Sequence, residues 1–182
     1  APLSFFKVTV PVDVDLEAFA ALFDALRKVL RIRWGNAGYT YSSWEVLERY
    51  AGARAIYAHA RRYCGFDVGQ SVRQLERFCD AIRTVNWLTA AGPELTAKLE
   101  AVRPVGLDAS NLITVLRDEH GLLVRAGQTP QIGDVNRLEF PPPYAASDRL
   151  LRPIRATQAN FLGRWDERST EAWLSRFERS ST

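Results

Sequence analysis

The chain has 182 residues, 47% of them hydrophobic and 25% charged, with a formal net charge of +3. Nine Phe, six Tyr and five Trp supply enough large apolar side chains for a core, so we expect the chain to fold without disulfides or metal ions. No stretch approaches the roughly 20 apolar residues of a membrane helix, and the N-terminus lacks a secretory signal pattern. We therefore expect a single domain over residues 1–182, located in the cytoplasm.

Three elements are predicted in the first 41 residues. Apolar residues alternate with polar ones over 6–12, which is the period of a strand with one buried face. Over 16–30 apolar residues recur at helical spacing, and the acidic residues at the start and basic residues at the end suit the helix dipole. The aromatic run at 39–41 predicts a strand or an extended turn.

Two further helices are predicted from capping boxes. A serine followed three residues later by Glu or Gln is typical of a helix start. One such box, at Ser42, predicts a helix that runs toward Tyr63, and another, at Ser71, predicts a helix that reaches Ile82.

The second half of the chain is predicted to contain a β-hairpin. Residues 112–116 and 122–126 flank a turn that contains Gly121. Before it, a buried strand is predicted at 85–89 and a short helix at 94–100. After it, we expect an ordered Gly/Pro-rich loop and two helices, at 127–143, 144–151 and 170–177. Together the elements predict an α+β fold, with helices packed on one face of a mainly antiparallel sheet and the loop folded against the core.

Residue patterns that carry chemistry are few. Asp13, Asp15 and Glu17 lie where a helix begins, so we interpret them as first-turn acids instead of a metal or acid–base site. The Asp-Glu-His run at 118–120 lies at a hairpin tip, where three consecutive residues do not converge easily on one ion. His59 lies on a predicted helix without a nucleophile nearby. The sequence therefore predicts no catalytic residue and no enzyme.

Metal and cofactor sites are not indicated either. The two cysteines, Cys64 and Cys79, have no cysteine or histidine companions at ligand spacing, so we expect two free, buried thiols in a reducing compartment. No phosphate-binding loop, dinucleotide fingerprint or nucleophile elbow is present. We expect no metal ion and no cofactor.

Arginine dominates the basic residues and suggests an alternative function. A nucleic-acid-binding or regulatory module would place the arginines of two predicted helices on one basic face near aromatic rings. Glu76 and Asp80 interrupt that face, which favours an ordinary solvated helix surface. The arginines concerned are Arg61, Arg62, Arg73, Arg77 and Arg83.

Short motifs in a fixed order over most of the chain resemble a known family. The most specific are Asn86-Trp87-Leu88-Thr89 and the segment from Ala126 to Asn136. The others are Pro11 before an amphipathic helix, Gly35-Asn-Ala-Gly-Tyr39, Tyr63-Cys-Gly-Phe-Asp67, Leu151-Arg-Pro153 and Trp173-Leu-Ser-Arg-Phe177. Together they resemble the type VI secretion immunity family associated with VRR-Nuc nuclease toxins, formerly a domain of unknown function.

The resemblance implies a non-enzymatic inhibitor that binds a cognate DNA-cleaving toxin and covers its active site or substrate groove. Such a surface needs aromatic and charged anchors, and acidic groups suit a DNA-binding groove. Because the chain is slightly basic overall, an acidic face has to be local. We nominate as partner-facing the acidic residues of the hairpin tip and the following loop, with one tyrosine: Asp118, Glu119, Asp134, Glu139 and Tyr144.

Other interpretations stand beside this one. Asp134 is equally suited to stabilise a buried turn in the Gly/Pro-rich loop. For Asp118, Glu119, Glu139 and Tyr144, an ordinary structural role is favoured over a partner-facing one. The motif residues Trp87, Gly127, Gly133 and Trp173 are interpreted as structural, because specificity between related toxin and inhibitor pairs has to come from exposed positions. An unrecognised hydrolase that uses one of the two histidines is the remaining alternative.

Overall fold

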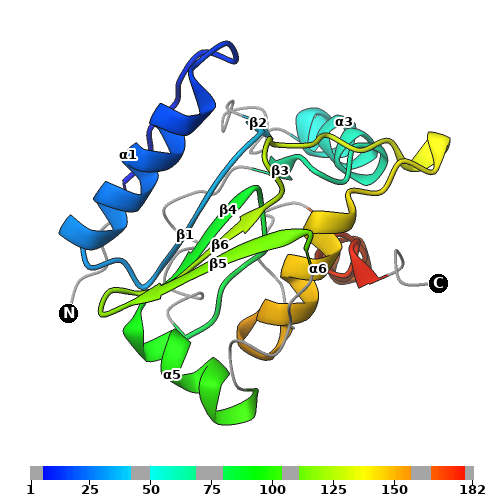
Figure 1. The fold of residues 1–182 in the computed structure, drawn as a ribbon. Coiled ribbons are helices and arrows are strands. Elements are labelled where there is room, and N and C mark those ends of the chain that lie inside the picture. Colours follow the sequence, from blue (N-terminus) through cyan, green and yellow to red (C-terminus); the bar gives the residue numbers. More distant parts are fainter. Residues whose placement is uncertain (1–5, 42–49, 69–79, 104–110, 157–164, 179–182) are drawn as a thin grey trace.

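The computed structural model describes residues 6–41, 50–68, 80–103, 111–156 and 165–178. Its centre is an antiparallel sheet of four strands in the order β1-β4-β6-β5 (Figure 1). Every residue of β4 is buried, as expected for an inner strand, whereas the middle of β5 at the sheet edge is exposed. The strands are Trp34–Ala37 (β1), Leu88–Ala91 (β4), Ile113–Asp118 (β5) and Gly121–Ala126 (β6).

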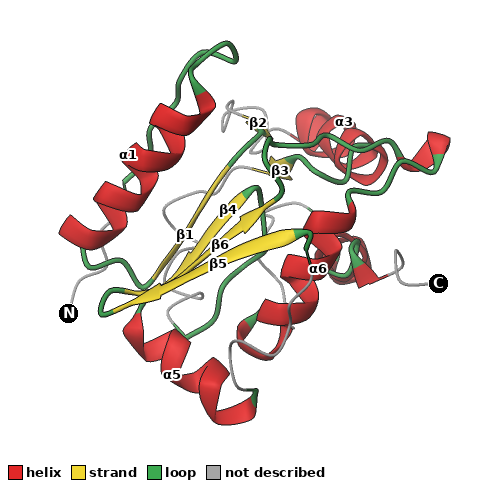
Figure 2. Ribbon diagram, in the orientation of Figure 1, coloured by secondary structure: helices red, strands yellow, loops and turns green. Residues whose placement is uncertain are grey.

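Helices lie on both faces of this sheet (Figures 1 and 2). Neighbouring residues of a strand point to opposite faces. On β5, Arg117 is bonded to Glu100 of α5, whereas Asp118 is bonded to Arg27 of α1. The predicted α+β class with a mainly antiparallel sheet is confirmed, and α1 adds a helix on the face that was expected to be bare. The helices at the sheet are α1 (Leu16–Val29), α5 (Pro93–Val102) and α6 (Pro142–Leu151).

A smaller group of elements lies beside the sheet. Two short parallel strands, β2 (Thr40–Tyr41) and β3 (Asp67–Val68), accompany α3 (Tyr50–Arg62) and α7 (Glu167–Leu174). Their apolar side chains form a second core cluster around Trp173. The aromatic run at 39–41, for which a strand or a turn was expected, thus contributes a strand.

The predicted hairpin and the predicted helices that lie within the described residues are confirmed. Asp15 caps α1, since its carboxylate accepts the amides of Glu17 and Ala18 at 2.9 and 3.0 Å. The hairpin forms around a two-residue turn, and α5, α6 and α7 overlap their predicted segments. The Gly/Pro-rich loop is ordered and, apart from the short 3-10 helix Val135–Arg137, largely irregular. Among the described residues, no helix is long and apolar enough to cross a membrane.

One sequence-based prediction about strands is wrong, and another places a real strand too early. Residues 6–12 form no strand, because no described strand lies beside them, and Phe6 and Val12 are exposed. The strand expected at 85–89 begins only at Leu88. The amides of Asn86 and Trp87 bond to side-chain oxygens at 3.0 and 2.8 Å, so this stretch turns before the ladder begins.

The structure also contains a strand that was not predicted, and two predicted helices lie wholly or partly outside the described residues. β1 was not predicted, because Gly35 indicated a break, yet this half-buried edge strand pairs with β4 over four residues. The expected start of the second helix, at Ser42, and most of the helix expected from Ser71 lie outside the described residues.

Buried arginines are a feature that composition did not indicate. Arg83 donates two hydrogen bonds to Asp67 and one, at 2.5 Å, to a backbone oxygen. Arg176 lies between the rings of Trp173 and Phe177, 3.9 and 4.3 Å from their centres, and burial lowers its pKa to about 10. Among the residues whose burial the structure describes, the buried arginines are Arg27, Arg83, Arg155 and Arg176.

Candidate partner-binding surface

The end of the β5–β6 hairpin holds two of the nominated acids. Asp118 accepts two hydrogen bonds from the Arg27 guanidinium, at 2.9 and 2.5 Å, and one from the His120 amide at 2.9 Å. The Glu119 side chain is 87% exposed, and its carboxylate lies 3.5 Å from His120 Nε2. Asp118 therefore ties the hairpin to α1, whereas Glu119 offers its carboxylate to solvent.

The bond between Arg27 and Asp118 predicts a pH-dependent stability. Arg27 holds the pKa of the Asp118 carboxyl below its ordinary value of 3.8. This group therefore stabilises the fold above that ordinary value, and the contribution is lost as pH falls through the lowered pKa. We expect Asp118→Asn to lower Tm by roughly 2–4 °C at neutral pH, and the difference to vanish in strong acid. Thermal unfolding followed by circular dichroism tests this; a constant difference at every pH would contradict it.

The hairpin turn also requires glycine at its last position. Gly121 has a φ of +110°, and a Cβ there would lie 2.1 Å from the backbone oxygen of Ala91. We expect Gly121→Ala to lower the free energy of unfolding by at least about 2 kcal/mol, because the hairpin end has to move away from β4. Urea unfolding measures the change. Gly35→Ala is the matched control, since its nearest neighbour would be a flexible side chain at 3.3 Å; equal midpoints for the two variants would contradict the prediction.

The other nominated acids lie in the loop between β6 and α6. Asp134, with 8% of its side chain exposed, accepts three hydrogen bonds from Arg62 at 2.8 to 3.1 Å and one from the Asn136 amide at 3.1 Å. Arg62 holds the pKa of this carboxyl below its usual range. The side chain of Asp134 thus stabilises the turn. Glu139 is exposed, and its backbone pairs with that of Asp134 at 2.9 and 3.0 Å.

Tyr144 lies in the core and offers no surface to a partner. Its side chain is fully buried, and its ring packs edge-on against Phe177 with the centres 5.7 Å apart. The hydroxyl accepts the Gln131 amide at 3.1 Å and donates to Asn86 Oδ1 at 3.4 Å, and burial raises its pKa. The nomination of Tyr144 is corrected, because α6 begins two residues before it, at Pro142, and turns the ring into the core.

The nominated acids do not form one surface. In Figure 1 the β5–β6 turn and the yellow segment that contains Asp134 lie on opposite sides of the molecule. A partner-facing role stays a prediction for Asp118 and Glu119 at the hairpin end and, separately, for Glu139.

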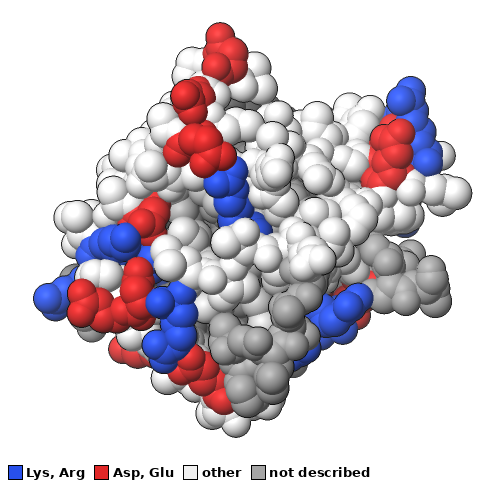
Figure 3. All heavy atoms as spheres, in the orientation of Figure 1, with Lys and Arg blue, Asp and Glu red and all other residues white. Residues whose placement is uncertain are grey.

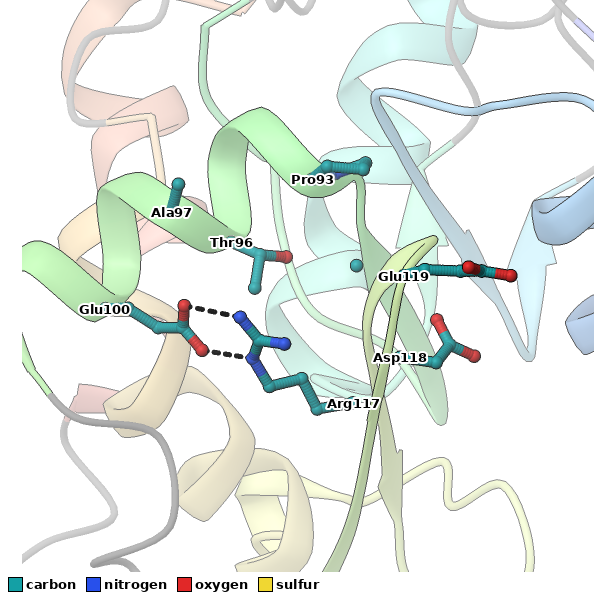
Figure 4. A pocket seen from close by; sticks show the side chains of 8 residues that line it. Pro93, Thr96, Ala97, Glu100, Arg117, Asp118 and Glu119 are labelled. Carbon is teal, nitrogen blue, oxygen red and sulfur yellow. Dashed lines mark hydrogen bonds and ion pairs between the residues drawn. The ribbon is translucent and has the colours of Figure 1, made fainter.

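A hollow of about 170 Å³ lies between the hairpin end and α5 (Figure 4). Small-molecule pockets usually measure roughly 300–1,000 Å³, so this hollow suits a single side chain of a partner. Glu100 and Arg117 face one another across it, joined at 2.8 Å. Asp118 and Glu119 also line the hollow, although their side chains point away from this pair in Figure 4. Sequence reasoning missed Glu100 and Arg117, because no local pattern marks a pair that joins a helix to a strand.

The described arginines do not assemble the basic face of the alternative function. Arg62 is bonded to a loop carboxylate, and Arg83 is buried in an ion pair, while Arg61 stays exposed. Arg73 and Arg77 lie outside the described residues.

The remaining chemical candidates have structural surroundings. Asp15 caps α1, and Glu17 is bonded to an arginine of β6 at 2.9 Å. Cys64 is a free, buried thiol whose pKa is raised by burial, whereas Cys79 lies outside the described residues. His59 is exposed on α3. Within the described part of the chain, no group of three or more His, Cys, Asp or Glu residues is placed to hold a metal ion.

The motif residues lie in the core and in tight turns. Trp87 and Trp173 are fully buried. Gly133 has a φ of +66°, and a Cβ there would lie 2.8 Å from the Cys64 sulfur. These surroundings support the structural interpretation of the motifs and leave exposed positions as the source of partner specificity.

Comparison with known proteins identifies the family. The model of the family TsiV, described as type VI immunity for VRR-NUC, matches residues 1–177. The chain belongs to this family. A solved structure, the Pseudomonas aeruginosa T6SS protein PA0821, is similar to this TsiV chain with a TM-score of 0.69 and 26% sequence identity. The match covers 87% of this chain and 48% of that one, so the TsiV chain spans about half the length of its structural relative. Among curated proteins, no sequence matches.

Proposed function

We propose that this TsiV-family chain is an immunity protein that binds a cognate type VI toxin, a DNA-cleaving nuclease of the VRR-NUC kind, and covers its active site or substrate groove. The family match over residues 1–177 is the observation that carries the proposal. The protein acts as a non-enzymatic inhibitor and works in the cytoplasm, where a DNA-cleaving toxin meets its substrate.

The described surface supports inhibition by contact. The hollow beside α5 is too small for a nucleotide-sized substrate, and the acids at the hairpin end are exposed or bonded to arginines. An inhibitor of this kind needs an extended surface with a few anchors, which a sheet edge and the exposed side chains at the hairpin end supply.

Co-expression with the nuclease encoded by the neighbouring gene tests the proposal. We expect the chain to restore survival, to co-elute with the nuclease, and to suppress DNA cleavage by the purified enzyme. A shift of bare DNA by the chain alone, lost at high salt, would favour the nucleic-acid-binding alternative. Unrelieved toxicity without complex formation would contradict the immunity function for that pair.

A further inference from the structure

The outer edge of β5 offers backbone groups that no other strand in the described part of the chain uses. The Gly127 amide donates to the Leu112 carbonyl, and the alternation of an antiparallel ladder then directs the backbone groups of Thr114 and Leu116 toward β6. The intervening residues direct their N–H and C=O groups away from the sheet. These outward-facing residues are Ile113, Val115 and Arg117.

Within the described residues, the strand itself lacks several devices that usually protect an exposed edge. β5 contains no Pro or Lys, and its register with β6 runs without a bulge over six pairs. Its one basic side chain, Arg117, is bonded to Glu100. Val115 is 36% exposed on the α5 face, and Leu116 is 44% exposed on the α1 face. An apolar edge left open in this way is typical of a surface that receives another strand.

The charge at the hairpin end of this edge selects the kind of partner. The carboxylates of Glu100 and Asp118 are bonded to arginines, whereas the exposed carboxylate of Glu119 lies 3.5 Å from the His120 ring. Figure 3 shows charged side chains of both signs gathered toward the hairpin end and an uncharged stretch beside them. A DNA-cleaving nuclease carries Lys and Arg for contact with phosphates, so its basic segments complement this end of the edge.

We propose that β5 binds an extended segment of the toxin as an added strand, with apolar side chains over Val115 and Leu116 and a Lys or Arg beside Glu119. Side chains directly opposite each other on neighbouring strands lie on the same face of a sheet. The toxin residue opposite Leu116 therefore lies on the α1 face, and the two toxin residues next to it along the added strand lie on the α5 face. Main-chain hydrogen bonds supply affinity, and the alternating side chains with the terminal charge supply specificity. This inference rests on the proposed function and names the surface through which it acts.

Amide hydrogen exchange tests the added strand directly. The chain is measured alone and in complex with a catalytically inactive variant of the neighbouring-gene nuclease. We expect exchange at Ile113, Val115 and Arg117 to slow at least tenfold in the complex. Thr114 and Leu116 are bonded to β6 in the free chain and should change little.

Substitutions separate the backbone from the side chain. Val115→Pro removes an outward N–H that the β5–β6 ladder does not use, so the fold should persist while binding weakens at least tenfold. Val115→Thr keeps that N–H and a similar shape, and should bind within about threefold of the original chain. Glu119→Lys should weaken binding at least fivefold, most strongly at low salt, whereas Asp13→Lys makes the same charge change on a distant exposed residue and should not.

The outcomes distinguish this inference from the proposed function. If the original chain binds the nuclease but the three amides stay unprotected and Val115→Pro binds normally, the β5 inference is overturned and immunity stands. If the original chain does not bind, both are overturned. If the same amides become protected in the chain alone as its concentration rises, with a dimer in sedimentation, the occupant is a second copy and the toxin assignment is overturned.

Discussion

Replacing Asp67 with alanine is expected to lower the free energy of unfolding by about 3–5 kcal/mol, because it leaves the Arg83 guanidinium buried without its counter-charge. The two side chains are 5% and 2% exposed, and the Asn36 side chain also donates to Asp67, at 3.0 Å. For a domain of this size the loss corresponds to a fall in Tm of roughly 10 °C or more. Thermal unfolding followed by circular dichroism measures it.

A second substitution shows whether charge or packing is responsible. Adding Arg83→Met to Asp67→Ala removes the stranded charge, so we expect the double variant to recover part of the lost stability. Asp13→Ala, which truncates an exposed acid, should change the free energy of unfolding by no more than about 0.5 kcal/mol. A double variant less stable than Asp67→Ala would show that the arginine stabilises the core through its packing.

Replacing Trp87 with alanine should have an effect of similar size, about 3–5 kcal/mol, because it removes the largest side chain at the centre of the core. The indole stacks on Phe19 of α1 with ring centres 6.4 Å apart, lies under Arg125 at 5.2 Å, and donates to the Gly127 carbonyl at 3.2 Å. We therefore expect α1 to loosen as well, which hydrogen exchange in that helix would show as faster exchange than in the original protein.

Two further variants calibrate the Trp87 result. Trp87→Phe keeps most of the ring but loses the hydrogen bond, so about 1–2 kcal/mol is expected. Phe6→Ala truncates an aromatic ring that is largely exposed, and should cost at most about 0.5 kcal/mol in urea unfolding. If Trp87→Ala cost no more than Phe6→Ala, the indole would not be part of the core.

The sequence predicts best those elements that are specified by neighbouring residues. The cap at Asp15 and the helical apolar spacing give α1, and the Gly121 turn between two apolar runs gives the hairpin. The segment at 6–12 shows the limit of periodicity, because alternation predicts a strand only where another strand lies beside it. β4 likewise begins later than predicted, because the Trp87 amide bonds to the Asn86 side chain instead of a neighbouring strand. Residue type alone does not show which of these two bonds forms.

The candidate site was predictable only in part, because its pairs join distant segments. Glu119 was found as an exposed hairpin acid, but the arginine that binds Asp118 lies 91 positions earlier. The dominance of arginine gave no indication that several guanidinium groups lie in the core with carboxylates from other elements. The open β5 edge also follows from strand order, since the same apolar run would be buried in an inner strand.

The strand order has a consequence for how the chain folds. β5 and β6 are joined by a two-residue turn and need little loop closure, whereas β1 reaches its partner β4 across about fifty intervening residues. Since β4 lies between β1 and β6, it is covered on both edges only after residues 121–126 have been made. Ribosomes add roughly 5–20 residues per second, so several seconds pass between the synthesis of β1 and that of the hairpin that completes the sheet. A nascent chain that ends before Ala126 lacks this template and should be sensitive to proteases and dependent on chaperones.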